Sequence, residues 1–189
     1  MTTRMWSWLM LPGLLLLSGC PDGGGGDGGL GNPVPPVAYV ANSGSSNVSA
    51  YTINGTGALV SAGTVSLAPS TPSSLAVSPN GTFAYVATNN GIFAFTIDAV
   101  TGVLTMVTGS PFSAGTNPNA VTVSPNGQYL YVANGGGTVS AYTINPTTGG
   151  LTSIGAAVAA GTSPSGVTVS PNGFFLYVSN QGSNDVSAY

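Results

Sequence analysis

Few residues of this sequence could take part in acid–base or nucleophilic chemistry, because only 3% of its 189 residues are charged and none is histidine. Arg4 is the only cation and Cys20 the only cysteine. Its four carboxylates are Asp22, Asp27, Asp98 and Asp185. A single cysteine excludes an intramolecular disulfide and a cysteine-based metal cluster. Without further Lys or Arg, the chain lacks the cations that bind nucleic-acid phosphates or anionic lipid. We therefore predict no nucleic-acid partner, no metal site and no cofactor.

Asparagines recur in a similar sequence context and are the candidates for a ligand rim. They are Asn42, Asn89, Asn134 and Asn180. Because an amide both donates and accepts hydrogen bonds, such a rim could bind a neutral ligand such as a glycan. The alternative is structural, because an Asn at the end of a strand tolerates the left-handed conformation of a turn.

These asparagines belong to a repeat that organises the sequence. Its clearest marker is a tyrosine followed by Val-Ala or Val-Ser, found every 46 residues at Tyr39, Tyr85, Tyr131 and Tyr177. A fixed period of 20–50 residues indicates a repeat architecture. The sequence must therefore be interpreted unit by unit rather than motif by motif.

Each unit contains four short apolar runs, which in the second unit are 75–77, 83–87, 92–97 and 103–107. They are rich in β-branched and aromatic residues, which predicts strands. They are apolar on both faces, which is typical of a sheet packed between two neighbouring sheets. The first two runs are joined by Ser78-Pro79-Asn80-Gly81, in which Pro presets φ and Gly takes a positive-φ position. Asp98 and the equivalent Asn54 and Asn145 predict a turn between the last two runs.

Four strands in a unit of 46 residues predict an all-β fold, a β-propeller of four-stranded antiparallel blades. The units at 73–109 and 119–157 are complete, whereas 37–66 lacks the first strand and 165–189 lacks the fourth. We therefore expect an incomplete ring of two full blades and two partial ones. Our hypothesis is that this is the N-terminal part of a longer propeller. If the chain is instead complete, its open end faces predict self-association.

The N-terminus predicts export to the bacterial cell envelope. A cation and a short apolar run in residues 1–19 are typical of a secretory signal peptide. The segment Leu17-Ser18-Gly19-Cys20 resembles the lipobox of bacterial lipoproteins, which implies cleavage before Cys20 and a membrane anchor on its thiol. The alternative is an ordinary signal peptide with an incidental cysteine. Residues 20–36 are rich in Gly and Pro and predict a tether, and the propeller follows in 37–189.

The repeated segments resemble a known family. Tyr-Val-Ala-Asn, Ser-Pro-Asn-Gly and Val-Ser-Ala-Tyr-Thr-Ile are similar to the repeats of YVTN propellers and of lactonase-like seven-bladed propellers, which include 6-phosphogluconolactonases. The resemblance implies a functional face formed by the loops within and between blades around the central channel. Related propellers often place His or a charged group after the Pro that opens the first strand. Here those positions are Ser73, Asn119 and Ser165, so no catalytic residue can be carried over.

Two functions remain open at this point. The first is a binding or scaffolding module for a protein partner or a neutral ligand on an envelope lipoprotein. The alternative is a lactonase-like hydrolase whose catalytic groups lie in blades absent from this chain. Asp98 and Asp185 fall in loops at opposite faces of a blade, so they are not expected to act as a glycosidase pair. With no group that titrates there, we expect binding to change little between about pH 5 and 9.

Overall fold

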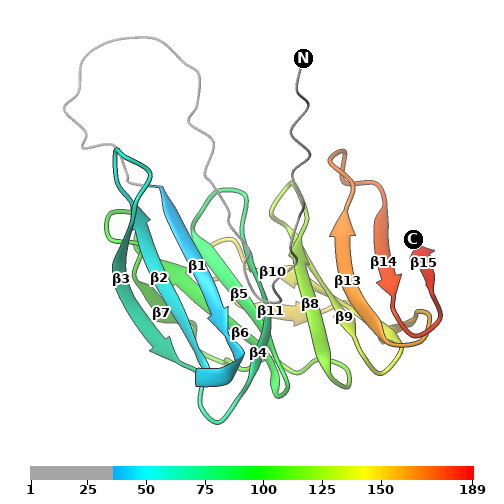
Figure 1. Ribbon diagram of the computed structural model, residues 1–189. Helices are drawn as coiled ribbons and strands as arrows, with labels where there is room; N and C mark the ends of the chain where they lie inside the picture. The colour runs from blue at the N-terminus through cyan, green and yellow to red at the C-terminus, as the bar shows by residue number, and fades with distance from the viewer. Residues whose placement is uncertain (1–35) are drawn as a thin grey trace, which may run out of the picture.

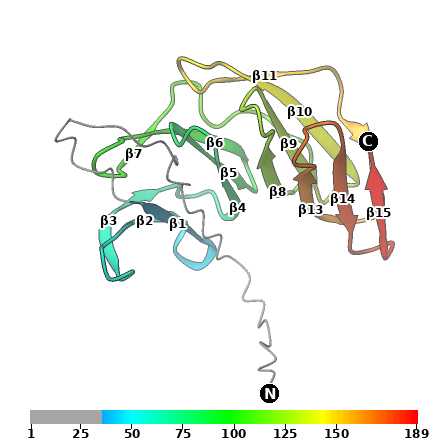
Figure 2. The same cartoon turned by 90° about the horizontal axis from the view of Figure 1, so that it is seen from above.

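The computed structural model describes residues 36–189, which form four antiparallel sheets placed side by side in an arc (Figures 1 and 2). We call these sheets blades 1 to 4. Blade 1 contains β1 (Val37–Asn42), β2 (Asn47–Ile53) and β3 (Leu59–Ser66), with the short 3₁₀ helix η1 (Ser43–Ser45) between β1 and β2. Blade 2 contains β4 (Pro72–Val77), β5 (Phe83–Thr88), β6 (Gly91–Ile97) and β7 (Leu104–Met106).

Blades 3 and 4 repeat the same meander. Blade 3 contains β8 (Pro118–Val123), β9 (Tyr129–Asn134), β10 (Thr138–Ile144) and β11 (Leu151–Ser153), and β12 (Val158–Ala159) also pairs with β10. Blade 4 contains β13 (Pro164–Val169), β14 (Leu176–Asn180) and β15 (Asp185–Ala188). Apart from β12, the strands of each blade are hydrogen-bonded in chain order. The predicted partial propeller of two complete and two three-stranded blades is therefore confirmed.

The predictions for the N-terminus are not tested by the fold. The predicted signal peptide, Cys20 and nearly all of the tether lie outside the described residues. Within residues 36–189, no helix has the length and apolar character needed to cross a membrane.

The predicted turns have the expected geometry. In the hairpin between β4 and β5, the N–H of Gly81 donates to the carbonyl of Ser78 at 2.8 Å, and Gly81 has φ of 71°. The equivalent Gly127 and Gly173 have φ of 72° and 77°. A glycine suits these positions because a side chain is disfavoured at positive φ. Between β6 and β7, Asp98 Oδ1 accepts from the N–H of Val100 at 3.1 Å, the predicted bond to the backbone two residues on.

Apolar side chains from adjacent blades form three separate clusters. We call the face of a blade that contacts the preceding blade its leading face, and the opposite face its trailing face. Between blades 2 and 3 the buried residues are Ala76, Phe83, Tyr85, Ala87, Ile92, Ala94, Val107, Val121, Leu130, Val132, Tyr142, Ile144 and Leu151. A comparable cluster joins blades 1 and 2, and a smaller one joins blades 3 and 4. Each sheet of the interior therefore buries both faces, which explains why its strands are not amphipathic.

A hydrogen bond from a tyrosine to a turn glycine also connects neighbouring blades, and we call it the Tyr–Gly latch. The hydroxyl of Tyr39 in blade 1 donates to the carbonyl of Gly102 in blade 2 at 2.8 Å. Tyr85 in blade 2 donates to Gly149 in blade 3 at 3.1 Å. Burial raises the pKa of Tyr39 to about 12 and raises the pKa of Tyr85 further, so both hydroxyls stay protonated and donate.

Candidate functional site

The candidate site is a hollow of about 570 Å³ where loops of all four blades meet, and we call it the inner hollow. It is lined by the first residues of β4 and β8 and by Ser163, which precedes β13. These three strands lie on the inner side of the arc (Figure 2). Its lining residues are Ala41, Ser43, Thr71, Pro72, Ser73, Asn89, Asn117, Pro118, Asn119, Gly135 and Ser163. Every one of these side chains is uncharged, so the hollow offers hydrogen bonds but no ionisable group.

The floor of the inner hollow is held by bonds between its loops. The N–H of Gly135 donates to the carbonyl of Asn117 at 2.6 Å, and the N–H of Gln181 donates to Ser163 at 3.0 Å. Asn117 and Ser163 have φ of 54° and 51°, a left-handed conformation that few residues other than glycine adopt. These bonds hold the strained loops in place, so the shape of the hollow is fixed by the backbone.

The residues after the blade-opening prolines connect one blade to the next. Ser73 Oγ donates to the carbonyl of Pro118 at 2.7 Å, and Asn119 Nδ2 donates to the carbonyl of Pro164 at 2.8 Å. Ser165 Oγ lies 3.4 Å from the carbonyl of Ser179 in its own blade. At the positions where related propellers often hold a charged group, Ser73 and Asn119 therefore make structural bonds between blades.

Three of the four predicted rim asparagines use their amides inside their own hairpins. Asn42 Nδ2 donates to Asn47 Oδ1 at 2.7 Å, and Asn134 Nδ2 donates to Ser140 Oγ at 3.0 Å. Asn180 Nδ2 donates to Asp185 Oδ1 at 2.7 Å. None of the three lines the inner hollow. The structure therefore assigns them to the ends of their strands.

Asn89 is the predicted rim residue that lines the inner hollow, and it lies one position beyond the others in the repeat. The position 46 residues after Asn42 and before Asn134 is Thr88, which ends β5 and is paired with Gly91. Asn89 is exposed, and its Oδ1 accepts from the N–H of Thr71 at 2.8 Å. Its Nδ2 makes no hydrogen bond within the described residues, so it is available to a ligand.

The buried amides of Asn134 and Asn180 are packed against glycines that the sequence analysis did not single out. A Cβ on Gly115 would lie 2.5 Å from Asn134 Nδ2, and a Cβ on Gly161 would lie 2.6 Å from Asn180 Nδ2. Gly115 and Gly161 are 46 residues apart, and each lies in the segment Ala-Gly-Thr. The repeat period could therefore have identified these two glycines. Both Asn Oδ1 atoms are buried without a partner among the described residues.

The two carboxylates of the repeats lie in different blades, Asp98 in the turn after β6 and Asp185 at the first position of β15. Asp185 Oδ1 in blade 4 accepts from Asn180 and from Ser183 Oγ, the latter at 3.0 Å. Hydrogen bonds from the Thr101 hydroxyl and then from the Thr101 and Val100 N–H groups lower the pKa of Asp98. Among residues 36–189 there is no group of three His, Cys, Asp or Glu side chains that could hold a metal ion.

A second hollow, of about 740 Å³, lies among the hairpin turns of blades 2 and 3. Its lining includes Pro79, Asn80, Pro125, Asn126 and Tyr129. The Oδ1 atoms of Asn80 and Asn126 already accept bonds from Ser78 and Ser124 at 2.7 and 2.6 Å. We favour the inner hollow because loops from all four blades converge there.

Solved propellers share this arrangement of blades. A protein from Lactobacillus plantarum has a TM-score of 0.70 at 22% identity, over 80% of this chain and 49% of its own. A putative 6-phosphogluconolactonase from Bacteroides uniformis has a TM-score of 0.68 at 24% identity, over 81% of this chain and 46% of its own. The periplasmic gluconolactonase PpgL of Pseudomonas aeruginosa has a TM-score of 0.62 at 27% identity, over 68% of this chain and 38% of its own.

The chain spans less than half the length of each of these three structures. A search of curated proteins gave no match. The family model described as lactonase, seven-bladed β-propeller, matches residues 32–163, which is more than half of the chain. The resemblance predicted from the repeated segments is thus confirmed, and the chain belongs to the lactonase family of seven-bladed β-propellers.

Proposed function

We propose that these blades act as a binding module that takes a neutral, polyhydroxylated ligand in the inner hollow. The observation that carries the proposal is the lining of that hollow, which combines hydroxyl and amide side chains from all four blades with no charged group. Sugar hydroxyls both donate and accept hydrogen bonds, so Asn89 Nδ2 and the hydroxyls of Ser43, Thr71 and Ser163 suit them. A charged ligand would find no ion-pair partner there.

The cellular setting is part of the same proposal. We propose that Cys20 carries a lipid and that the module acts at the bacterial cell envelope. The basis is the lipobox-like segment that ends at Cys20 and the apolar run before it. Metabolic labelling with a radioactive fatty acid tests this directly, because the label should be incorporated and a Cys20→Ser variant should lose it. Equal incorporation by the variant would contradict the anchor.

Lactone hydrolysis is the second candidate, and the family membership favours it. PpgL, a gluconolactonase, shares 27% identity over 68% of this chain. A sugar lactone is itself neutral and polyhydroxylated, so it belongs to the ligand class that the inner hollow suits. Hydrolysis also needs a group that activates water or polarises the carbonyl. None of the side chains that line the inner hollow is an ordinary general base, so we propose binding for these blades and keep hydrolysis as the second candidate.

Calorimetry on the full chain with a panel of neutral mono- and oligosaccharides tests the binding proposal. We expect at least one sugar to bind, and Asn89→Leu to weaken it by about fivefold because a hydrogen bond is worth roughly 1 kcal/mol. Asn90→Leu is the matched control, since Asn90 is an exposed neighbour that does not line the inner hollow. Absence of binding at millimolar sugar, or equal affinity of Asn89→Leu, would contradict the proposal.

A lactone-hydrolysis assay separates the two candidates. We expect the full chain to show no turnover above the spontaneous rate. If the full chain hydrolyses the lactone and a folded Ser163→Ala variant does not, the binding proposal is contradicted and hydrolysis is supported. Ser163 is chosen because it lines the inner hollow and its side chain makes none of the bonds that connect the blades.

A further inference from the structure

The turn between β2 and β3 of blade 1 contains an Asn-Gly pair, Asn54-Gly55. In such a pair the amide nitrogen of the glycine can attack the Cγ carbon of the preceding side chain, because no Cβ blocks its approach. The attack needs an N–H that no other group binds and a backbone with room to close the ring. Six Asn-Gly pairs occur in residues 36–189, so the surroundings of each decide which one reacts.

The fold holds the glycine in five of these six pairs. Three are hairpin glycines whose N–H donates at 2.8 Å to the serine carbonyl three residues earlier, namely Gly81, Gly127 and Gly173. The N–H of Gly135 donates to the carbonyl of Asn117 at 2.6 Å. Gly91 is buried and pairs with Thr88 between β5 and β6. Each of these glycines must be released by a local opening before it can attack.

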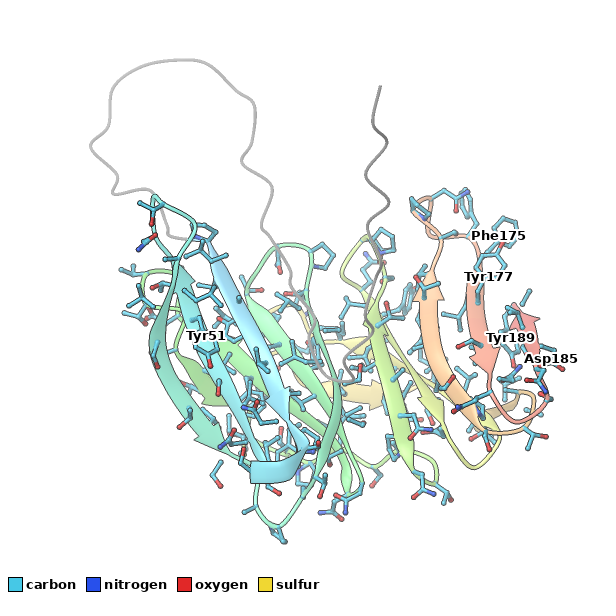
Figure 3. All side chains as sticks on the ribbon, in the orientation of Figure 1. Tyr51, Phe175, Tyr177, Asp185 and Tyr189 are labelled. Atoms are coloured by element: carbon cyan, nitrogen blue, oxygen red, sulfur yellow. The ribbon has the colours of Figure 1, made fainter. Side chains whose placement is uncertain are left out.

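Gly55 is free of such constraints. Its N–H makes no hydrogen bond within the described residues, and a Cβ on it would meet nothing within 4 Å. Asn54 and Gly55 are both exposed. Their turn follows the strand in which Tyr51 is labelled in Figure 3 and projects beyond the end of the sheet. The nitrogen of Gly55 can therefore approach the side chain without first breaking a contact.

The side chain of Asn54 is arranged for this attack. Its Oδ1 accepts from the hydroxyl of Thr56 at 2.7 Å and from the N–H groups of Thr56 and Ala58, both at 3.0 Å. Donors on a carbonyl oxygen stabilise the negative charge that develops there when the carbon is attacked. Asn54 Nδ2, which must leave, makes no hydrogen bond within the described residues. The turn thus activates the carbonyl carbon and does not hold the leaving group.

The equivalent turns of blades 2 and 3 cannot undergo the same reaction. Blade 2 has a carboxylate there, Asp98, which accepts from the N–H of Val100 at 3.1 Å, so the turn tolerates an acid. Blade 3 has Asn145, but Pro146 follows it and has no N–H. Both turns are exposed although a preceding blade packs against each sheet. A blade packed on blade 1 would therefore leave Asn54 exposed as well.

We propose that Asn54 is a site of spontaneous deamidation. The nitrogen of Gly55 bonds to Asn54 Cγ, the bond from Cγ to Nδ2 breaks, and Nδ2 leaves as ammonia with the proton that Gly55 gives up. Water then opens the succinimide ring. Cleavage of the new bond at Cγ leaves an aspartate at position 54, and cleavage of the original peptide bond leaves an isoaspartate. Either product adds one negative charge to a chain whose formal net charge is −3.

Incubation of the folded full chain at mildly alkaline pH, followed by mass spectrometry of chymotryptic peptides, tests the proposal. Cleavage after Tyr51 and Leu59 releases peptide 52–59, which contains no other asparagine. This peptide should show the mass of the acid first. We expect Asn54 to react at least about fivefold faster than each of the other five asparagines, because their glycines must first be released from the fold.

Gly55→Pro is the matched variant, because Pro146 occupies the same place after Asn145 in blade 3. It should abolish the reaction at Asn54 and leave the other five rates unchanged, with circular dichroism showing that the fold is retained. In concentrated urea the parent should lose its preference, and the six asparagines should react at similar rates. Faster reaction at another asparagine of the folded parent, reaction at Asn54 in Gly55→Pro, or a preference that persists in urea would overturn the proposal.

Discussion

The interface between blades 2 and 3 and the trailing face of blade 4 are built from nearly the same residues, yet their environments differ. Phe83, Tyr85 and Ile92 are buried, while Phe175, Tyr177 and Val186 lie in solvent. The strand pairing within the sheets is the same in both places. What differs is that, within residues 36–189, a following blade covers only the first of these two faces. In a repeat protein, stability thus depends on the neighbour as much as on the repeat itself.

The largest difference between the two regions is expected when the phenylalanine ring of each is removed. Phe83→Ala should lower the free energy of unfolding by about 3–5 kcal/mol, because it leaves a cavity between two blades. In the chain of 189 residues, Phe175→Ala should cost less than about 1 kcal/mol, because no other blade among the described residues packs on that ring. Denaturant unfolding of both variants measures the two losses. Equal losses would show that blade stacking does not determine the contribution of the ring.

Alanine at the latch glycine Gly149 and at the equivalent turn glycine of blade 1, Gly57, should give the next largest difference. Both Gly149 and Gly57 have positive φ, so each alanine variant should lose about 1–2 kcal/mol from backbone strain. At Gly149 the new Cβ also lies 2.5 Å from Phe83 Cδ1, which should add about 1–3 kcal/mol. Thermal unfolding should therefore separate the two variants by several degrees. Matching midpoints would mean that the turn of blade 3 does not contact Phe83.

Removal of the tyrosine hydroxyl should give a smaller difference between the two regions. Tyr85→Phe should cost about 1 kcal/mol, because it removes the bond to Gly149 and leaves that buried carbonyl without a donor. Tyr177→Phe should leave the free energy of unfolding unchanged within about 0.3 kcal/mol, because its hydroxyl makes no hydrogen bond within the described residues. Urea unfolding at pH 7 measures both, and a loss in Tyr177→Phe equal to that in Tyr85→Phe would contradict the latch.

Alkaline pH should weaken the interfaces between blades through their buried tyrosines. The pKa of Tyr39 is raised by burial from 10 to about 12, so the unfolded chain loses this proton first as the pH rises. Its contribution to stability is therefore complete below pH 10 and declines as the pH approaches 12. In Tyr39→Phe this contribution to the decline should disappear. The measurement is the free energy of unfolding of the parent and of Tyr39→Phe between pH 8 and 12. An equal decline in the two proteins would contradict the role of Tyr39.

The smallest effect is expected at the turn between the third and fourth strands. Asp98 in blade 2 and Asn145 in blade 3 accept the same backbone bonds, so the turn forms without a charge. The lowered pKa of Asp98 means that its small contribution is present above pH 3.8 and declines as the pH falls through its folded-state pKa. Asp98→Asn should leave the thermal midpoint at pH 7 nearly unchanged, because an amide oxygen can accept the same backbone bonds. A larger loss in thermal unfolding would reveal a role for the charge.

The fold could be predicted because its signals are local and repeated. The 46-residue period, the Ser-Pro-Asn-Gly hairpins and the Asx turn at Asp98 each depend on a few adjacent residues. Asn89 could not be placed by this reasoning, because the loops after Asn42, Thr88 and Asn134 differ in length. The sequence pattern therefore grouped Asn89 with the other three asparagines. The strand pairing shows instead that Thr88 occupies their position in blade 2.

The latches and the inner hollow depend on contacts between distant parts of the sequence. Tyr39 and Gly102 are 63 residues apart, and Ser73 and Pro118 are 45 apart. No pattern within one blade shows which carbonyl of the next blade accepts each bond. The roles of Ser73 and Asn119 as connections between blades thus required coordinates.

Thiol labelling at one position of the repeat tests the central claim that a following blade, rather than the residue itself, determines burial. Val139→Cys and Val186→Cys, each in a Cys20→Ser chain, place one thiol at equivalent positions in blades 3 and 4. At submicromolar protein we predict that Cys at position 186 reacts at the rate of an exposed thiol. Cys at position 139 should react at least about 10³-fold more slowly, because its thiol becomes accessible only when the blades separate. Equal rates would contradict the account.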